Sequence, residues 1–266
     1  MSQLECFEVF AVRYGHMAER TANLNFLGGD PHETSMAMDY FVWVLRGPQT
    51  TWVVDTGYSE EVAAKRGRRM LRNPAEGLRD IGIDPDKVEN VIITHLHYDH
   101  VGNWHLFPNA TFHLQDLEMQ FATGRHMEHM QFREAYEVDE ICAMVRRVYA
   151  GRVRFHDGDA DLMPGLSVHH IGGHTMGLQS VRVWTKRGWV VLASDASHYY
   201  ANMEGPRPFS IVFSVDGIIE GYKRLRDLAD TDAHIVPGHD PLVMERYPAV
   251  PGLEGKAVRL DEMPTG

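Results

Sequence analysis

The segment from His95 to His100, with the sequence HLHYDH, constrains the fold of this chain more than any other part. It directly follows residues 91–94, a short apolar run of the kind that forms a fully buried strand. Side chains two apart in extended backbone point the same way, so His95 and His97 can hold one ion together. A turn after them lets the last two polar side chains face a second position. Buried without partners, these side chains would be very costly. The segment therefore predicts a strand that ends at a metal site.

Three further positions share this local form, in which a polar side chain comes just after an apolar strand. They are His174, Asp195 and His239. Glycines precede His174 and His239, and glycine lets the backbone turn tightly and approach a site closely. Because side chains delivered from several strand ends into one cleft are how a scaffold builds a catalytic site, we expect these residues to meet the HLHYDH segment.

The composition limits the classes of protein to which the chain can belong. Its 266 residues include 16 histidines, and histidine is the commonest metal ligand and the usual proton carrier. Lys and Arg total 26 against 37 for Asp and Glu, and the net charge of −11 argues against a nucleic-acid partner. No apolar run approaches the ~18 residues that a membrane span needs. With no visible secretory signal and only two cysteines, Cys6 and Cys142, we expect a cytoplasmic protein with free thiols and no membrane partner.

Apolar periodicity indicates short strands mixed with helices, and we find no repeat, low-complexity tract or linker. The expected strands are 41–45, 51–54, 91–94, 110–114, 153–155, 166–171, 181–184, 189–193 and 233–236, and the expected helices are 59–71, 115–121, about 131–149 and 215–228. Strands in both halves with helices between them predict two sheets packed together and covered by helices, an α/β (α+β) fold. We expect one domain over residues 1–266.

The order and spacing of the polar strand-end positions resemble those of the metallo-β-lactamase superfamily over most of the chain. The resemblance rests on His95-x-His97-x-Asp99-His100, then His174, Asp195 and His239, together with the early strand-end motif Asp55-Thr56-Gly57. Chance would have to supply four separated motifs in the right order. The resemblance implies an αββα sandwich, with two mixed β-sheets flanked by helices and the metals at the rim between the sheets.

Within that superfamily, the chain looks most like the N-acyl homoserine lactonases in its length, its early Asp-Thr-Gly and the segment from Ser194 to Ser197. This resemblance implies two Zn²⁺ per chain, for which Mn²⁺, Co²⁺ or Fe²⁺ could substitute. It places one zinc on His95, His97 and His174, the other on Asp99, His100 and His239, and Asp195 as a bridge between them. It also implies a small-molecule lactone as substrate, such as an N-acyl homoserine lactone.

The chemistry implied by the resemblance is attack on the lactone carbonyl by a hydroxide that bridges the two metals. Asp99 would pass a proton to the leaving oxygen. His198 stands three residues after Asp195, where the lactonases carry a tyrosine. A neutral imidazole can donate a hydrogen bond, so we expect His198 to assist the substrate carbonyl, with Tyr199 as the alternative.

Other activities of this fold stay open at the level of the sequence. A thioesterase of the glyoxalase-II type is one, although we find no basic cluster near the carboxyl end for a glutathione carboxylate. A catabolic lactonase or esterase is another, and a non-enzymatic metal-binding protein is a third. The sequence does not specify the lactone, the native metal or the oligomeric state, although a homodimer is an option because relatives often pair.

Several further residues that could take part in chemistry have ordinary structural interpretations. Residues 126–129 lack a zincin spacing and are expected on a loop or at the pocket rim. His169 and His170 are adjacent on a strand, so at most one can face the site. Asp55 is expected to support a ligand. The basic residues 65–72 are expected to form a solvated helix face, with a site for an acidic partner as the alternative. Four apolar side chains could belong either to the core or to the pocket wall: Phe121, Met127, Met130 and Phe132.

Overall fold

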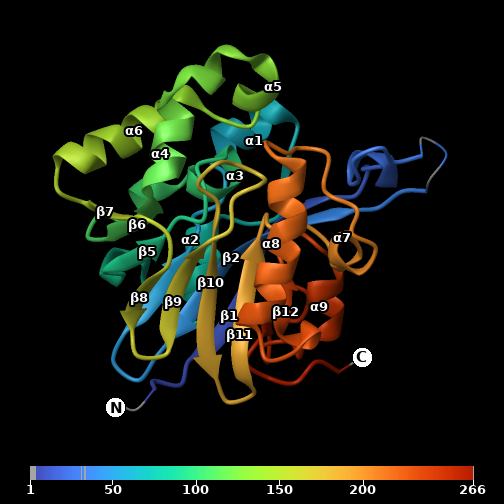
Figure 1. Cartoon of the computed structure of the whole chain (residues 1–266). Helices are drawn as coiled ribbons and strands as arrows, with labels where there is room; N and C mark the ends of the chain where they lie inside the picture. Colours follow the sequence, from blue (N-terminus) through green and yellow to red (C-terminus); the bar gives the residue numbers. More distant parts are fainter. Residues whose placement is uncertain (1–3, 31, 33, 266) are drawn as a thin grey trace.

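The computed structural model describes residues 4–30, 32 and 34–265, and its strands form two sheets that face each other (Figure 1). In this part of the chain the larger sheet has eight strands in the order β13-β1-β2-β3-β5-β6-β7, with β4 paired to β1. The smaller sheet has five, in the order β12-β11-β10-β9-β8. The strands are β1 Glu8–Met17, β2 Met38–Arg46, β3 Thr51–Val54, β4 Arg69–Met70, β5 Asn90–Ile92, β6 Thr111–Gln115, β7 Val153–His156, β8 Ala160–Met163, β9 Leu166–His170, β10 Gln179–Thr185, β11 Gly188–Ser194, β12 Ile235–Pro237 and β13 Ala257–Arg259.

Helices lie against the outer faces of both sheets. Figure 1 shows α4, α5 and α6 gathered at one end of the molecule, and α8 running beside β11. The α-helices are α1 Glu60–Arg66, α2 Pro74–Asp80, α3 Tyr98–Val101, α4 Asp116–Thr123, α5 Met130–Arg133, α6 Val138–Tyr149, α7 Tyr200–Glu204, α8 Val215–Leu228 and α9 Leu242–Arg246. Short 3-10 turns are Ala22–Leu24, Pro85–Lys87, Trp104–Leu106, Arg125–Glu128 and Asp232–His234.

Apolar clusters hold the layers together. One lies between the sheets and brings Trp43 and Val54 of the larger sheet together with Val181 and Leu192 of the smaller one. A second packs helices onto the outer face of the larger sheet, and a third packs α8 onto the smaller sheet. Burial of apolar area from both faces of each sheet is the main favourable term in such a sandwich. The αββα arrangement expected from the sequence is confirmed.

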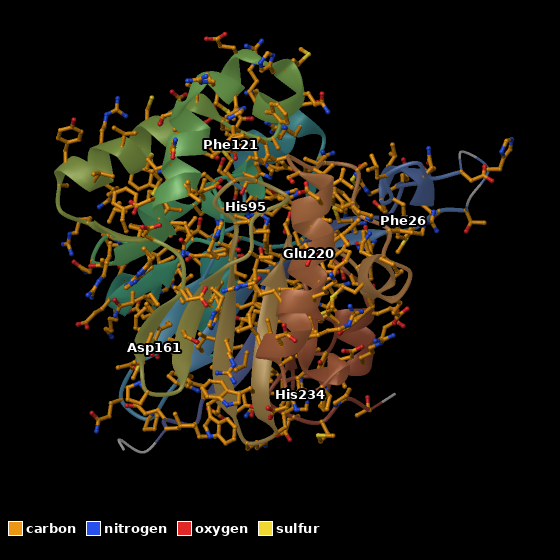
Figure 2. All side chains as sticks on the ribbon, viewed as in Figure 1. Phe26, His95, Phe121, Asp161, Glu220 and His234 are labelled. Carbon is orange, nitrogen blue, oxygen red and sulfur yellow. The ribbon has the colours of Figure 1, made fainter. Side chains whose placement is uncertain are left out.

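Strand direction explains why polar residues far apart in the sequence collect at one rim. Strands β3, β5, β6 and β7 run parallel, and β12 runs parallel to β11. Parallel neighbours deliver the residues after their carboxyl ends to the same edge of the sheet. Figure 2 shows His95, which follows β5, in the interior between the α4–α6 helices and α8.

Most expected elements are present, and two have the expected bounds. Strand β3 covers residues 51–54, and α8 covers residues 215–228 with Ser214 as its N-cap, whose Oγ accepts from Gly217 N at 3.1 Å. The other expected strands differ by one to three residues at their ends. Strands β1, β4, β8 and β13 and helices α2, α3, α7 and α9 are additional to the elements expected.

Two expected helices are wrong in extent. The helix expected over 59–71 ends at Arg66, because Gly67 adopts φ 61° and the chain returns as β4 to pair with β1. The helix expected over about 131–149 is two helices, α5 and α6. The chain leaves helical geometry between them, where the Ala135 carbonyl accepts from Tyr98 N at 2.9 Å. This contact ties the break to the HLHYDH segment.

Candidate metal centre

The eight polar residues singled out in the sequence come together at the rim between the sheets. They lie after the ends of four strands. Strand β5 leads through His95 and His97 into α3, β9 leads into the loop that carries His174, β11 leads into Asp195, and β12 leads into the turn before His239. All but Asp99 are at least nine-tenths buried, and Asp99 is partly exposed. The residues brought together are His95, His97, Asp99, His100, His174, Asp195, His198 and His239.

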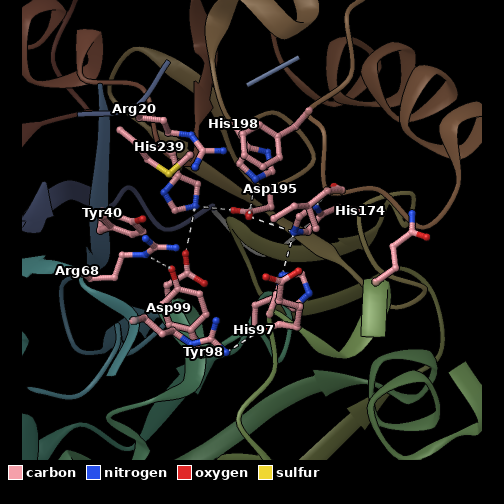
Figure 3. Close-up of a pocket in the computed structure, with 17 residues that line it drawn as sticks. Arg20, Tyr40, Arg68, His97, Tyr98, Asp99, His174, Asp195, His198 and His239 are labelled. Carbon is pink, nitrogen blue, oxygen red and sulfur yellow. Dashed lines mark hydrogen bonds and ion pairs between the residues drawn. The ribbon is translucent and has the colours of Figure 1, made fainter. Parts of the chain in front are cut away.

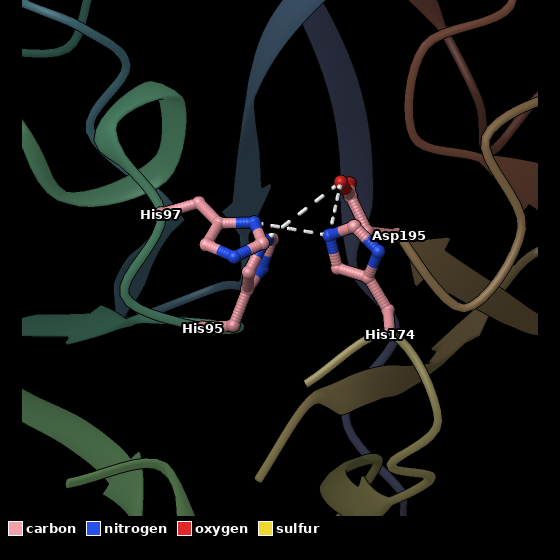
Figure 4. A group of neighbouring side chains, drawn as sticks. All are labelled: His95, His97, His174 and Asp195. Carbon is pink, nitrogen blue, oxygen red and sulfur yellow. Dashed lines mark hydrogen bonds and ion pairs between the residues drawn. The ribbon is translucent and has the colours of Figure 1, made fainter. Parts of the chain in front are cut away.

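One half of this cluster contains three imidazoles and one carboxylate oxygen. His97 Nδ1 lies 3.0 Å from His95 Nε2 and 3.0 Å from His174 Nε2 (Figure 4). Asp195 Oδ2 lies 3.2 Å from His174 Nε2 and 3.7 Å from His95 Nε2. Four donor atoms of these types, converging on one point, match the ligand set that zinc prefers.

The other half contains Asp99, His100 and His239 around the second oxygen of the same carboxylate. Asp195 Oδ1 lies 3.0 Å from His239 Nε2 and 3.3 Å from His100 Nε2. Asp99 Oδ2 lies 3.9 Å from each of these two ring nitrogens. The two oxygens of Asp195 therefore face two different groups of ligand-type side chains.

The ring nitrogens that point away from the centre are held by other parts of the fold. His174 Nδ1 is 2.8 Å from the Ile211 carbonyl, and His239 Nδ1 is 2.8 Å from the Asp39 carbonyl. His100 Nδ1 is 2.7 Å from Asp55 Oδ2. Such contacts fix the tautomer and leave the inner nitrogen free of a proton, which is the form that binds a metal. His100 Nε2 is buried and has no hydrogen-bond partner among the described residues. The donor set thus fits a pair of divalent metal ions.

Asp55 supports the centre from behind. Its carboxylate accepts from Thr94 N and from Thr94 Oγ1, each at 2.8 Å, as well as facing His100. Its backbone has φ 60°, an unusual value for a residue with a side chain. Ser194, directly before Asp195, also has a positive φ of 49°. Both strained positions lie at strand ends beside the cluster, where strain is commonly tolerated for function.

Close approach of two strand ends requires glycine at position 238. A Cβ there would lie 2.8 Å from the Ser194 carbonyl and 3.0 Å from Asp195 Oδ1. Gly238 N also donates to the Ser197 carbonyl at 2.9 Å. The turn before His239 can therefore pass directly behind Asp195 only without a side chain.

Sequence reasoning missed Glu118, a buried carboxylate in α4 that joins two of the metal-centre segments. Its Oε1 accepts from Leu96 N at 2.9 Å, and its Oε2 accepts from Thr175 Oγ1 at 2.6 Å and from Gly177 N at 3.1 Å. Leu96 lies between His95 and His97, and Thr175 follows His174. Burial raises the pKa of Glu118, while these donors oppose the rise. In the sequence, the residue is indistinguishable from a solvated helical acid.

Burial sets the charge of three of the imidazoles. It holds the pKa of His95 and of His97 well below the ordinary value, and neighbouring histidines add to this effect. Burial lowers the pKa of His198 to about 3, against the opposing effect of Asp195. All three rings are consequently neutral near pH 7, and a neutral ring can coordinate a metal or donate from one nitrogen. For His100 and His239 burial also favours the neutral ring, but the carboxylates around them outweigh it and raise the pKa.

His198 and Tyr199 lie in different places. His198 lines the pocket, with Nε2 at 2.9 Å from Asp195 Oδ2, and its ring stacks on Phe209 with centroids 3.5 Å apart. Tyr199 is fully buried, and its hydroxyl donates to the Ala37 carbonyl at 3.2 Å. The tyrosine faces the core, so only His198 has the position needed to meet a substrate.

A cavity of about 160 Å³ opens onto the cluster. Figure 3 shows Asp195 at its centre, His97 and His174 on one side, and Asp99 and His239 on the other. Beside His97 and His174 the cavity continues into a recess of about 210 Å³ whose apolar wall includes Phe121, Phe132 and Val212, with Gln131, Glu134 and Ser210 among the other lining residues. Phe121 and Phe132 thus serve as both core and pocket wall, whereas Met127 and Met130 line a separate groove.

The histidines that were not expected to bind a metal lie outside the cluster. His169 Nε2 contacts Ser167 Oγ at 2.9 Å, and His170 Nε2 contacts the Met176 carbonyl at 2.7 Å. His126 packs against Phe213 with ring centroids 5.2 Å apart. The expectation of a wholly solvated basic helix over 65–72 is wrong, because Arg66 and Arg68 line the pocket.

A sequence profile of the metallo-beta-lactamase superfamily matches residues 38–239, which include every residue of the cluster. The chain belongs to the metallo-beta-lactamase superfamily.

Individual relatives agree with this family. An N-acyl homoserine lactonase from Bacillus sp is 32% identical over 221 residues, which cover 76% of this chain and 82% of the relative. The solved structure of a quorum-quenching N-acyl homoserine lactone hydrolase superimposes with a TM-score of 0.77 at 22% identity, covering 94% of this chain and 99% of the other. AidC, a dizinc quorum-quenching lactonase solved with the product N-hexanoyl-L-homoserine, gives a TM-score of 0.68 at 19% identity, with coverages of 90% and 92%.

Cys6 and Cys142 are both exposed and free, as expected from the sequence. Among the residues described, no helix has the length and apolar character needed to cross a membrane.

Proposed function

We propose that this protein is a metal-dependent hydrolase that opens the ring of a small lactone. The observation that carries the proposal is the carboxylate of Asp195, whose two oxygens face two separate groups of ligand-type side chains below an open pocket. The N-acyl homoserine lactonases to which the chain is similar support lactones as the substrate class.

The metals are proposed to be two Zn²⁺, with Mn²⁺, Co²⁺ or Fe²⁺ as substitutes. His95, His97 and His174 would hold one ion, Asp99, His100 and His239 the other, and Asp195 would bind both. Two such ions supply a nucleophile derived from water near neutral pH and polarise the lactone carbonyl. The dizinc relative supports this assignment.

The chain's own residues would guide the proton and the carbonyl. Asp99 is partly exposed to the pocket, whereas the other members of the cluster are buried, so its carboxylate can reach the leaving oxygen and pass a proton to it. His198 is neutral and faces the pocket, so one ring nitrogen can donate a hydrogen bond to the carbonyl oxygen as negative charge develops there.

We also propose that residues 1–266 act as one domain. Strand β1 near the start of the chain pairs with β13 near its end, with Ala11 opposite Val258. Both strands belong to the sheet whose rim carries the HLHYDH segment. Removal of either end would therefore expose the core between the sheets.

A substrate screen by proton release tests the proposed activity. The zinc-loaded protein is assayed with N-hexanoyl-L-homoserine lactone, γ-butyrolactones, p-nitrophenyl acetate, S-lactoylglutathione, a cephalosporin and bis-p-nitrophenyl phosphate, with the Asp99→Asn variant as the control for contaminating enzymes. Lactones should have the highest kcat/KM. A preference for the glutathione thioester would place the protein with the thioesterases, and hydrolysis of none of the lactones would refute the proposal.

A further inference from the structure

The pocket wall differs on the two sides of the cluster. The recess with Phe121, Phe132 and Val212 adjoins His97 and His174. Figure 3 shows Arg20, Tyr40 and Arg68 on the other side, next to Asp99 and His239. An apolar acyl chain would be accommodated by the recess, and it would leave the arginine side without a partner.

Two of the three pocket arginines have no carboxylate partner. Arg66 Nε donates to Glu137 Oε1 at 2.8 Å, so its charge is balanced. Within the described part of the chain, no carboxylate lies at salt-bridge distance from the guanidinium of Arg20 or of Arg68, although acidic residues outnumber basic ones in the chain by 37 to 26. The carboxylates of Asp99, Glu134 and Asp195 also line this pocket, but Asp99 and Asp195 belong to the proposed metal centre and none of the three pairs with Arg20 or Arg68. Two guanidinium groups without an ion-pair partner beside that centre point to an anionic ligand.

The guanidinium of Arg68 is held in place at two of its nitrogens, Nε and Nη1. Its Nε donates to the Tyr98 hydroxyl at 2.9 Å, and its Nη1 lies 3.8 Å from Met17 Sδ. No described residue accepts a hydrogen bond from Nη2. A guanidinium fixed at one edge presents the rest of its planar fork to a carboxylate.

Arg20 is fixed in a similar way at the opposite end of the same wall. Its Nε donates to Asn25 Oδ1 and its Nη2 to the Leu24 carbonyl at 2.9 Å. Its Cζ lies 5.2 Å from the centre of the Phe209 ring, the ring that stacks on His198. Arg20, Phe209 and His198 thus form a row that leads from the pocket rim to the cluster.

We propose that the arginine side of the pocket selects lactones that carry a carboxylate group in addition to the ring ester. Arg68 is the principal contact and Arg20 a second one, and the ring carbonyl lies over Asp195. The inference rests on the proposed lactonase function and adds the substrate's charge. The neutral N-acyl homoserine lactones would be the poorer class of substrate for this protein.

The test compares one lactone in a charged and a neutral form. Steady-state rates are measured with γ-butyrolactone-γ-carboxylate, with its methyl ester and with N-hexanoyl-L-homoserine lactone. The variants are Arg68→Gln, Arg68→Lys and Arg20→Gln. The matched control is Arg154→Gln, because Arg154 is exposed on β7 and its substitution changes the net charge by the same amount.

The wild-type protein should prefer the carboxylate over its methyl ester by about 10- to 100-fold in kcat/KM, the range expected for hydrogen bonds to a charged group. Arg68→Gln should remove most of this preference by raising KM for the carboxylate, and it should change the rates on the methyl ester by a much smaller factor. Arg68→Lys should keep part of the preference, Arg20→Gln should reduce it less than Arg68→Gln does, and Arg154→Gln should keep all of it.

The outcomes separate the two proposals. If the charged and neutral lactones are hydrolysed equally well, or if Arg68→Gln slows both by the same factor, the selection of a carboxylate is wrong and the lactonase function stands. If no lactone is hydrolysed, the proposed function fails and the inference fails with it. Calorimetry measures the carboxylate contact directly: 2-hydroxyglutarate, the ring-opened product, should bind the wild-type protein more tightly than it binds Arg68→Gln, and equal affinities would overturn the inference.

Discussion

The two sides of the pocket are built by different means. The metal-centre side consists of residues that follow strands β5, β9, β11 and β12. The outer ring nitrogens of His95, His100, His174 and His239 there meet a backbone carbonyl, a hydroxyl or a carboxylate. The arginine side consists of Arg20 and Arg68, which lie on connections outside the long strands. Rigid strand ends suit a reaction that tolerates little displacement, and connections can vary without disturbing it. The difference implies that reaction chemistry and substrate selection can be altered separately.

Removal of the metals should produce the largest effect. After dialysis against a chelator, hydrolysis of every lactone should fall to the background rate, and added zinc, manganese or cobalt should restore it. Asp195→Asn should lower the metal content as well as the rate, because one carboxylate serves both groups of ligands. Elemental analysis of the loaded wild-type protein should give close to two ions per chain. One ion or none would contradict the assignment, and Asp159→Asn, an aspartate away from the centre, is the control.

Asp99→Asn should lower kcat by about 10²- to 10⁴-fold, the usual contribution of a positioned proton donor. The amide keeps the shape of the side chain but loses the charge that helps to hold a metal, and it cannot take up a proton from the attacking water and pass it to the leaving oxygen. KM should change little, and the factor should be the same for charged and neutral lactones, since the residue belongs to the metal-centre side. A variant that keeps near-wild-type kcat with both metals bound would assign the proton to another group.

His198→Ala should have a smaller effect, about 2–4 kcal/mol of transition-state stabilisation, with both metals retained. The pKa of about 3 keeps the ring neutral throughout the working range, so the loss should not depend on pH between 6 and 9. Tyr199→Phe is the matched comparison, because its hydroxyl bonds to the Ala37 carbonyl in the core. If Tyr199→Phe were the more damaging of the two for kcat, the tyrosine and not the histidine would assist the carbonyl.

The comparison of the two sides also explains how much could be predicted from the sequence. Seven candidate ligands could be found because each lies just after a short apolar strand, and a strand with the turn after it is local information. His198 came from the resemblance to the lactonases, which carry a tyrosine at that position. Helix α8 could be predicted with its bounds because its apolar residues keep a helical period, and in the structure Ser214 caps its start. The αββα arrangement came from the family resemblance, which itself rests on the same local motifs.

The arginine side could not be predicted in this way. Arg68 was assigned to a solvated helix, but Gly67 ends the helix and β4 pairs with Gly15 and His16 of β1, more than 50 residues earlier. That pairing, which no local pattern indicates, turns Arg68 into the pocket. Strand β1 itself was missed because it is buried on both faces over much of its length and shows no simple alternation. Glu118 was missed because its four donors come from three distant segments.

Substitution of Glu140 should produce the smallest effect, on stability and not on chemistry. It concerns α6, whose N-cap residue Glu137 pairs with Arg66 of the pocket. Glu140 lies in α6 and is 7% exposed, and its Oε2 has no hydrogen-bond partner among the described residues. Burial raises its pKa from 4.5 to about 8, and the nearby Glu137 and Asp99 add to the rise. Because the folded chain holds this proton more tightly than the unfolded chain, the stabilising contribution is complete below about pH 4.5 and is lost as the pH rises through 8.

Glu140→Gln should therefore leave the free energy of unfolding nearly unchanged at pH 5 and raise it by about 1–3 kcal/mol at pH 8.5, where the wild-type protein carries a buried charge without a partner. Urea unfolding of the metal-loaded protein at the two pH values measures this difference, and Glu245→Gln, an exposed substitution in α9, should show no dependence on pH. The kcat on neutral lactones should not change. An equal difference in stability at pH 5 and pH 8.5 would mean that Glu140 does not titrate in the folded protein. The change in the free energy of unfolding would then reflect packing around α6 and not a buried charge in that helix.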